Sequence, residues 1–539
     1  MTRAVVPVVG ASHGLARRCA TPLFALGVVA SACVQAQGFG VFDAAAGGIM
    51  TMPDMTGPGA DIPGSGRPGR WLQPTLDASA TLTDNYRLSS TNRQSDLVLQ
   101  VSPGLRLNSS TGRMRGFLNY SLTGVAYANH RDENNFQNSL DADLMVEAIE
   151  NHLFVDLGGS ISQQSVSAFG QQSNDPTLVN PNRTEVATYR VSPYLRGWLG
   201  DLATYEARLT YQTTHASAAS NSSSGDAVIQ IASDRAFSSL GWSIDLSRQM
   251  LDFAEGNRTF DDRVRGSLIY HASSDLNLSL IVGHENTDLG GPVRQSQGTA
   301  GLGVDWRPSA RTTLTAERES RAFGNSYSMT FEHRLPRSVI RYADRRDAST
   351  GQSLRGSQGT NYDLLFNQFA SIQPDPVKRA QLVNDFLTSN GISPTASVPG
   401  GTLPSAALDQ RQQELSFAWL GQRDTVTLTA ARSDSSQIDP AATGTGDFAN
   451  GNHVIQQGFT LDVSHRLTPR ATLTLTAQQS RSRGSVSGDS SRLRTLNAAM
   501  DFNLNSLVRL TFGGRHNAFD NASAPYTESA LYANVNLGF

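Results

Sequence analysis

The last residues of this chain alternate regularly between apolar side chains and polar or small ones. One face carries Leu531, Ala533, Val535, Leu537 and Phe539, and the residues between them form the other face. Because successive side chains of a β-strand point to opposite faces, a period of two predicts a strand with one apolar face. Such a strand must cover its apolar face with protein or with lipid.

The same alternation recurs after residue 70. It is clear at 113–122, 276–282 and 471–478, where apolar residues alternate with mostly polar ones. Segments of roughly ten alternating residues separated by turn residues are typical of a transmembrane β-barrel. A soluble β-sandwich or propeller alternates in a similar way, but we find no repeat of blade length in the chain.

Counting strands backward from Phe539 orders the connections into long loops that alternate with tight turns. Short turns are predicted at 198–201, 233–235, 335–337 and 467–470, and the longest connection, 347–408, is then extracellular. We predict an all-β fold, an antiparallel transmembrane up-and-down β-barrel of about 22 strands (range about 18–22) over residues 71–539. The terminal Phe539 resembles the signal that the outer-membrane barrel assembly machinery recognises, so this machinery and outer-membrane lipid are expected partners.

The tryptophans agree with this topology. Trp71, Trp198, Trp306 and Trp419 lie beside predicted short turns, whereas Trp242 is placed nearer the middle of a strand. Barrels carry aromatic girdles at the membrane interfaces, so this distribution favours a transmembrane barrel.

The N-terminus predicts export. A basic segment with Arg17 and Arg18 precedes a short apolar run at 23–33, and Ala36–Gln37 offers a signal peptidase cleavage site. We therefore expect a signal peptide at 1–36 and location in the outer membrane of a Gram-negative bacterium. A lipoprotein site at Cys33 is an alternative. Both cysteines lie before residue 37, so no disulfide is expected afterwards.

Residues 37–70 are rich in Gly and Pro, which predicts a periplasmic leader. This segment is too short for the folded plug of a TonB-dependent transporter. The net charge of −3 gives no case for nucleic acid, and the chain has neither an H-E-x-x-H nor a P-loop motif. We predict no enzyme activity, no cofactor and no metal site.

Charged residues on the predicted polar faces are candidates for the barrel lumen. They are Arg113, Arg115, Arg190, Arg208, Arg263, Arg265, Arg337, Arg341, Glu206, Glu317 and Glu332. Rings of arginine could select anionic sugars, because the guanidinium group binds carboxylates through two hydrogen bonds. The alternative is mutual salt bridging that fills a structural interior, and the mixed signs favour this alternative.

A helical pattern interrupts the strands within 347–408. Asp375 suits an N-cap, and an apolar stripe of helical spacing follows it. The stripe includes Val377, Val383, Phe386 and Leu387. This helix could form a lid or constriction over the lumen, or it could cap the rim.

Four segments also resemble a known family. They are 80–86 (Ala-Thr-Leu-Thr-Asp-Asn-Tyr), 95–104, 306–314 and 321–327. They resemble the outer-membrane barrel proteins associated with the PEP-CTERM/exosortase system, which occur at exopolysaccharide loci. The resemblance implies a conduit or assembly component for exopolysaccharide export, with the polysaccharide and export-locus proteins as partners. The alternatives are a general diffusion porin, an occluded structural barrel and, last, an outer-membrane enzyme.

Overall fold

The computed structural model describes most of the chain from residue 72 onward. The described residues are 72–217, 221–237, 239–254, 258–291, 293–349, 379, 383, 407–438, 446–448, 453–485, 489–505 and 507–539. They all belong to one compact unit. Across these ranges, no helix is long and apolar enough to cross a membrane.

The unit is built from β-strands that run up and down in sequence order. Their bounds are β1 (Leu72–Thr83), β2 (Asp96–Thr111), β3 (Met114–Tyr127), β4 (Asn135–Ile149), β5 (Leu153–Ser165), β6 (Arg183–Leu199), β7 (Ala203–Ala216), β8 (Ser222–Phe237), β9 (Leu240–Phe253), β10 (Thr259–Ser273) and β11 (Leu276–Thr287). The second half comprises β12 (Gln295–Ser309), β13 (Thr312–Arg321), β14 (Gly324–Leu335), β15 (Ser338–Ser349), β16 (Leu408–Leu420), β17 (Asp424–Gln437), β18 (His453–Thr468), β19 (Ala471–Gly484), β20 (Ser490–Asn503), β21 (Val508–Asn521) and β22 (Tyr526–Gly538). Two short 3-10 helices lie in connections, η1 (Arg131–Glu133) and η3 (Gly446–Phe448).

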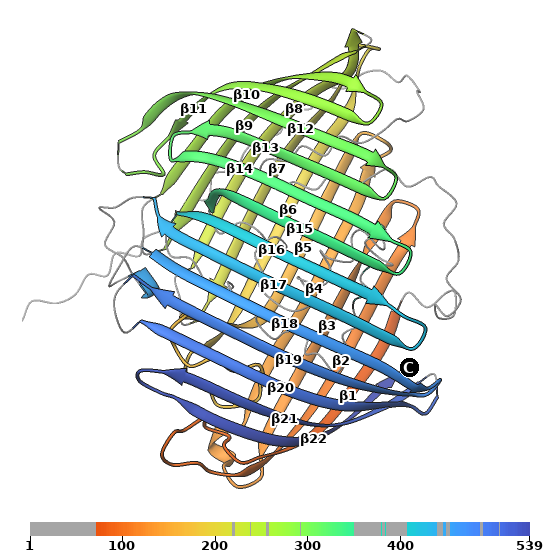
Figure 1. Cartoon of the computed structure of the whole chain (residues 1–539), viewed down its shortest axis with the longest axis vertical. Coiled ribbons are helices and arrows are strands. Elements are labelled where there is room, and N and C mark those ends of the chain that lie inside the picture. Colours follow the sequence, from red (N-terminus) through yellow and green to blue (C-terminus); the bar gives the residue numbers. More distant parts are fainter. Residues whose placement is uncertain are drawn as a thin grey trace, which may run out of the picture. The chain divides into compact units, whose positions relative to one another are not determined.

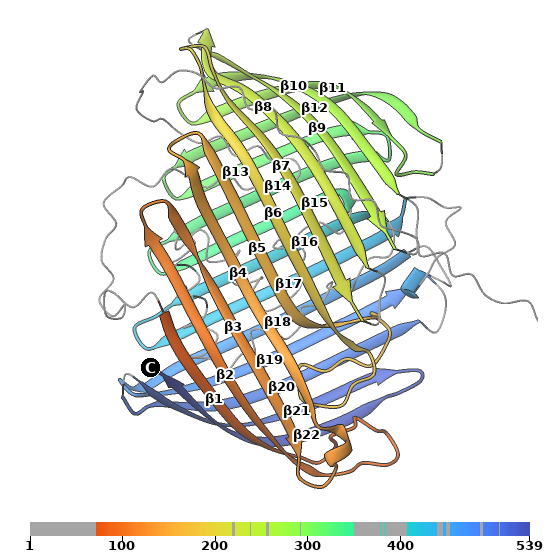
Figure 2. The same ribbon diagram turned by 180° about the vertical axis from the view of Figure 1, so that it is seen from behind.

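The sheet closes on itself. Every strand pairs antiparallel with its neighbour in sequence, and β1 also pairs with β22, from Thr75 opposite Gly538 to Thr83 opposite Ala530. The seam extends to the last residue, because the Phe539 amide donates to the Pro74 carbonyl at 3.0 Å. Figure 1 shows the wall from β10 to β22, and Figure 2 shows β1–β9 from behind. Closure leaves no free strand edge, which lipid could not solvate. The predicted closed barrel of 22 strands is confirmed.

The two ends of the barrel differ in the length of their connections. One end carries tight turns such as 310–311, 336–337 and 469–470, together with the start of β1 and the end of β22. Bacterial barrels place short turns on the periplasmic side, so the longer connections are extracellular. The predicted turn at 233–235 is wrong, because β8 continues through a register shift to Phe237. Trp242 is therefore the third residue of β9 and lies near a short turn.

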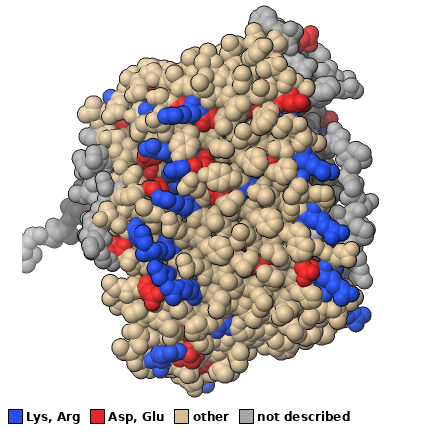
Figure 3. All heavy atoms as spheres, in the orientation of Figure 1, with Lys and Arg blue, Asp and Glu red and all other residues tan. Residues whose placement is uncertain are grey.

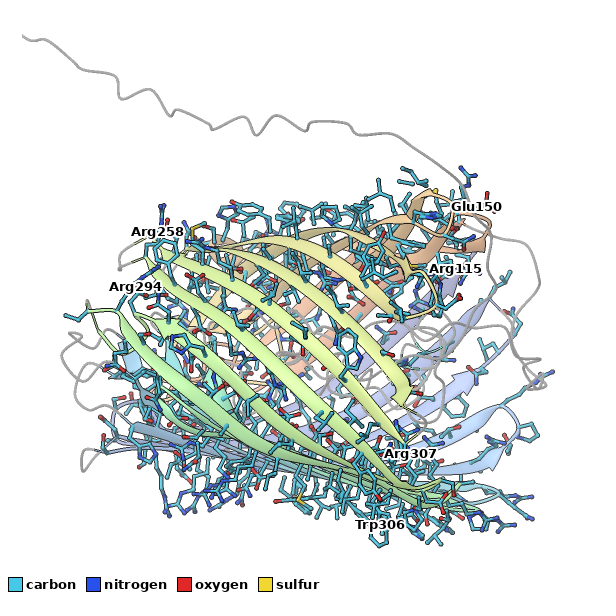
Figure 4. All side chains as sticks on the ribbon, turned by 90° about the horizontal axis from the view of Figure 1, so that it is seen from above. Arg115, Glu150, Arg258, Arg294, Trp306 and Arg307 are labelled. Carbon is cyan, nitrogen blue, oxygen red and sulfur yellow. The ribbon has the colours of Figure 1, made fainter. Side chains whose placement is uncertain are left out.

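The outward face of the barrel is apolar. Residues paired directly across strands share a face, and Leu268, Leu280 and Leu302 pair in one row across β10, β11 and β12. All three are about half exposed or more, from 48% to 68%. Trp306 lies on the same face at the periplasmic end, and Figure 4 shows it outside the ribbon. An exposed apolar band around a closed barrel is the surface that lipid covers. The protein is an outer-membrane β-barrel.

Candidate functional site

One extracellular connection folds into the barrel. Residues 166–182, here named the lumen loop, join β5 to β6. The side-chain amide of Asn174 donates to Gln478 Oε1 at 2.6 Å and to Thr495 Oγ1 at 3.0 Å. Gln478 lies on β19, and seven strands (β4, β3, β2, β1, β22, β21 and β20) separate β19 from β5 around the closed sheet. The lumen loop therefore crosses the barrel interior as a chord.

A buried ion pair holds the middle of the lumen loop. Asp175 pairs with Arg515 of β21, and Arg515 Nη2 also contacts Glu528 Oε1 of β22 at 2.9 Å. Glu528 is fully buried and accepts hydrogen bonds from Asn517 at 2.7 Å and Thr83 at 2.9 Å. Burial raises the pKa of Asp175, but the charge of Arg515 and hydrogen bonds from Thr177 outweigh burial and lower this pKa below its usual value.

The lumen loop also contributes to an apolar cluster inside the barrel. Leu178 packs in a buried group drawn from several inner-wall strands and from the β1–β2 connection. The other members are Tyr86, Leu88, Val98, Val125, Tyr127, Leu493, Phe519 and Tyr526. The Val179 amide donates to the Tyr86 carbonyl at 3.0 Å, which joins two extracellular connections. This packing fixes the lumen loop against the wall, since burying apolar side chains is the main favourable term in such contacts.

Side chains satisfy the backbone of the lumen loop. Arg183 donates to the carbonyls of Asp175 at 2.7 Å and Ser173 at 2.8 Å, and Gln171 donates to the Leu88 carbonyl at 2.7 Å. A loop in the interior needs such partners, because unpaired buried backbone groups are costly. The amide side chains of the segment thus have a structural role.

A second acidic anchor lies at the start of the lumen loop. Asp447 of η3 accepts hydrogen bonds from the Ser167 hydroxyl and from the Ala168 amide, the latter at 2.7 Å. Burial raises the pKa of Asp447 above its usual value although both hydrogen bonds lower it. The connection between β17 and β18 therefore meets the lumen loop through a carboxylate.

The remaining inner wall carries compact ion-pair clusters. Arg321, at the end of β13, is only 5% exposed at its side chain and contacts Asp261 at 2.9 Å, Glu285 at 2.6 Å and Asp347 at 2.6 Å. A second cluster joins Arg265 to Glu317 and Glu319.

A third cluster, nearer the periplasmic end, joins Arg208 to Asp156 at 2.7 Å and Glu206 at 2.9 Å. The guanidinium group of Arg208 also lies 3.8 Å from the Tyr194 ring centroid. Cation–π stacking of this kind fixes the Arg208 side chain against the wall.

The register shows where the predicted lumen charges lie. On the strand face opposite the exposed apolar band lie Arg115, Arg190, Arg208, Arg263, Arg265, Arg341, Glu206, Glu317 and Glu332. Arg113 and Arg337 instead lie in short periplasmic turns, where Arg113 faces Glu150 at 3.7 Å. Figure 4 labels Arg115 and Glu150 at this end. Arg190, Arg208 and Arg265 pair with inward carboxylates, whereas Arg115, Arg263 and Arg341 form no ion pair with another described residue.

Other predicted sites fall outside the described residues. These are the cleavage site Ala36–Gln37, the leader 37–70 and, in the helical insertion, Asp375, Val377, Phe386 and Leu387. Arg379 and Val383, one helical turn apart, are described as helical and buried. The helical insertion at 347–408 stays a prediction. Within the described ranges, no group of three or more His, Cys, Asp or Glu side chains could hold a metal ion.

The sequence pattern does not predict that the lumen loop folds into the barrel. It also omits Arg321, Arg515 and Glu528 from the candidate residues. The available signals are weak. The loop combines five Gln and Asn residues with the apolar pair Leu178–Val179, a composition that suits docking more than exposure.

Comparisons with known proteins find matches of low sequence identity and low TM-score. No family model matches the chain, and no curated protein does. The siderophore receptor PirA from Acinetobacter baumannii matches with a TM-score of 0.46 and 9% identity, over 88% of this chain and 81% of the receptor. The FrpB iron transporter from Neisseria meningitidis matches with a TM-score of 0.46 and 9% identity, over 87% of this chain and 82% of the transporter. OccK5 (OpdH) from Pseudomonas aeruginosa matches with a TM-score of 0.30 and 11% identity, over 87% of this chain and 98% of OccK5.

Proposed function

We propose that this barrel is an outer-membrane conduit for a hydrophilic polymer of the exopolysaccharide type, narrowed by the lumen loop. The observation that carries the proposal is the chord that the lumen loop makes across the interior, from β5 to Gln478 of β19. A loop that is docked by an ion pair, an apolar cluster and backbone hydrogen bonds can set the width of a passage. The resemblance to exopolysaccharide-associated barrels supplies the substrate class.

The chemistry of the remaining wall supports a polar substrate of low charge. Arg208 of β7, Arg265 of β10 and Arg321 of β13 are each neutralised by adjacent carboxylates. Between these clusters the inward face carries half-buried hydroxyl side chains, including Ser243, Ser267, Ser279 and Thr315. Hydroxyl groups donate and accept hydrogen bonds, as sugar hydroxyls do. Such a wall could exchange hydrogen bonds with a moving glycan without trapping it electrostatically.

The test combines genetics with electrophysiology. Deletion of the gene should reduce the amount of secreted polysaccharide. A plasmid copy of the gene should restore secretion only if it encodes a barrel with an intact lumen. In planar bilayers, the purified protein should show a small baseline conductance that neutral oligosaccharides block. Unchanged polysaccharide secretion in the deletion strain would refute the export proposal. A large open conductance indifferent to oligosaccharides would instead identify a general diffusion porin.

A further inference from the structure

Arginines gather on the outward face of one extracellular hairpin. Arg481 and Arg483 of β19 and Arg492 and Arg494 of β20 occupy outward positions, since the residues between them, such as Ser482 and Leu493, are buried on the inner face. Arg481 and Arg492 are direct cross-strand partners. We name these four arginines the outer arginine cluster.

The outer arginine cluster lacks internal compensation. Directly opposed residues on neighbouring strands have Cβ atoms about 5 Å apart, and like charges at such positions destabilise the pair. None of the four forms an ion pair with another described residue, and the buried Nε of Arg492 has no hydrogen-bond partner there. The acidic neighbour in register is Asp520 of β21, opposite Arg492. Four positive charges therefore face one carboxylate.

Outward arginines near the extracellular ends of β15–β17 do have carboxylate partners. On the outward face of β15–β17, Arg346 pairs with Asp409, Arg411 with Asp344, and Arg432 lies 3.5 Å from Asp434. Figure 3 shows acidic residues interspersed with basic ones along the left side of this face, over the strand ends opposite the C-terminus. The fold thus compensates outward arginines with protein carboxylates on β15–β17 but leaves the outer arginine cluster without them.

The position of the outer arginine cluster fits a membrane interface. On the same faces, toward the periplasm, β19 presents Leu475 (48% exposed) and β20 presents Leu496 (60% exposed), which belong to the apolar band. Arg494 and Arg492 lie one and two outward positions from Leu496, and Arg481 and Arg483 lie three and four from Leu475, just before the 485–489 connection. Arginine stems can cover apolar surface while their charged groups reach the headgroup layer.

We propose that the outer arginine cluster binds the phosphate-bearing headgroup of a lipid in the extracellular leaflet. Guanidinium groups bind phosphate oxygens through paired, charge-assisted hydrogen bonds, and a doubly charged phosphate would offset the mutual repulsion of Arg481 and Arg492. The lipid's acyl chains would lie on the apolar band beside Leu475 and Leu496. This inference is independent of what passes through the lumen.

The test uses the full-length barrel in detergent, with native mass spectrometry to count bound lipid. The probe is diphosphoryl lipid A, compared with the same lipid after removal of both phosphates. The variant R481Q/R483Q/R492Q/R494Q should lose affinity at least tenfold, since basic residues near a membrane surface attract anionic lipid headgroups. The matched control R113Q/R337Q/R423Q/R470Q removes the same charge from exposed periplasmic turns and should retain binding.

Several outcomes would overturn the proposal. They are equal binding of the dephosphorylated lipid, an unchanged affinity in the cluster variant, or the same loss in the control. Inorganic phosphate should compete poorly, because it lacks the chains that anchor the lipid; full competition at equal concentration would show a free-anion site instead. Heat-modifiable gel mobility reports folding of each variant. If the fourfold variant fails to fold, R481Q/R492Q tests the same repulsive pair.

Discussion

Asp175 of the lumen loop forms a buried ion pair with Arg515 on the inner face of β21. The two side chains are 7% and 13% exposed, so bulk water screens their attraction weakly. Arg515 is also held by Glu528, whose remaining contacts reach Thr83 on β1. One cluster therefore links the lumen loop to the strands that form the seam of the barrel, and this link makes loop position experimentally accessible.

Substitution Asp175→Asn should release the lumen loop without unfolding the barrel. Asparagine keeps the shape but removes the charge that Arg515 compensates, and breaking a buried pair costs about 3–5 kcal/mol. Arg515 retains Glu528, so the wall stays folded. We expect larger single-channel conductance and protease cleavage within 166–182. Glu150→Gln, which alters an exposed pair in a periplasmic turn, is the control. Wild-type conductance and protection in Asp175→Asn would argue against docking by this pair.

Docking of the lumen loop should depend on pH in two opposite ways. The pKa of Asp447 is raised by burial, so its charged form is penalised in the docked state and docking strengthens as pH falls through that raised pKa. The pKa of Asp175 is lowered mainly by Arg515, although burial opposes this. Its contribution is complete above the ordinary value of 3.8 and is lost as pH falls further through the lowered pKa.

Channel recordings across pH can separate these two groups. Conductance should fall as pH decreases from neutral toward 4 and should rise again at lower pH. In Asp447→Asn, conductance should change little with pH above 3.8, whereas the rise in conductance at lower pH should remain. If the rise in conductance at low pH persists unchanged in Asp175→Asn, groups other than Asp175 cause it.

Arg321→Met should be among the most destabilising substitutions in the wall. It leaves Asp261, Glu285 and Asp347 close together without their shared cation, and the loss of one partner from a buried cluster costs about 3–5 kcal/mol. Arg318→Met, on the outward face of the same strand, changes the same residue type without touching this cluster. Denaturant unfolding of both variants in detergent measures the difference. Similar stability of the two variants would show that the cluster contributes little.

The barrel is predictable from the sequence because its information is local. Each strand pairs with its neighbour along the chain, so the alternation ending at Phe539 and the spacing of turns suffice to count strands. The error at 233–235 arises where a register shift lets β8 extend beyond a polar stretch that resembles a turn. Local patterns fail there because cross-strand pairing, not residue type, determines where the strand ends.

The interior is less predictable because its contacts join distant segments. Arg208 and Arg265 are recognisable as inward charges by alternation, but no pattern shows that each faces two carboxylates. Asn174 reaches Gln478, and Asp175 reaches Arg515, through a loop without periodicity. The period of a strand shows which side chains point inward. The docking of a loop depends on which strands it contacts in the folded barrel.

The depth of the membrane can be tested with one substitution at two positions of β11. Val282 and Asn286 both lie on the outward face, with Val282 in the apolar band and Asn286 near the extracellular end. A charged residue on the lipid face costs about 2–4 kcal/mol at the midplane and about 0–1 kcal/mol near the interface. Val282→Arg should therefore destabilise the barrel in lipid vesicles far more than Asn286→Arg, measured by denaturant unfolding. Equal costs, or a larger cost at Asn286, would mean that the apolar band does not mark the membrane core.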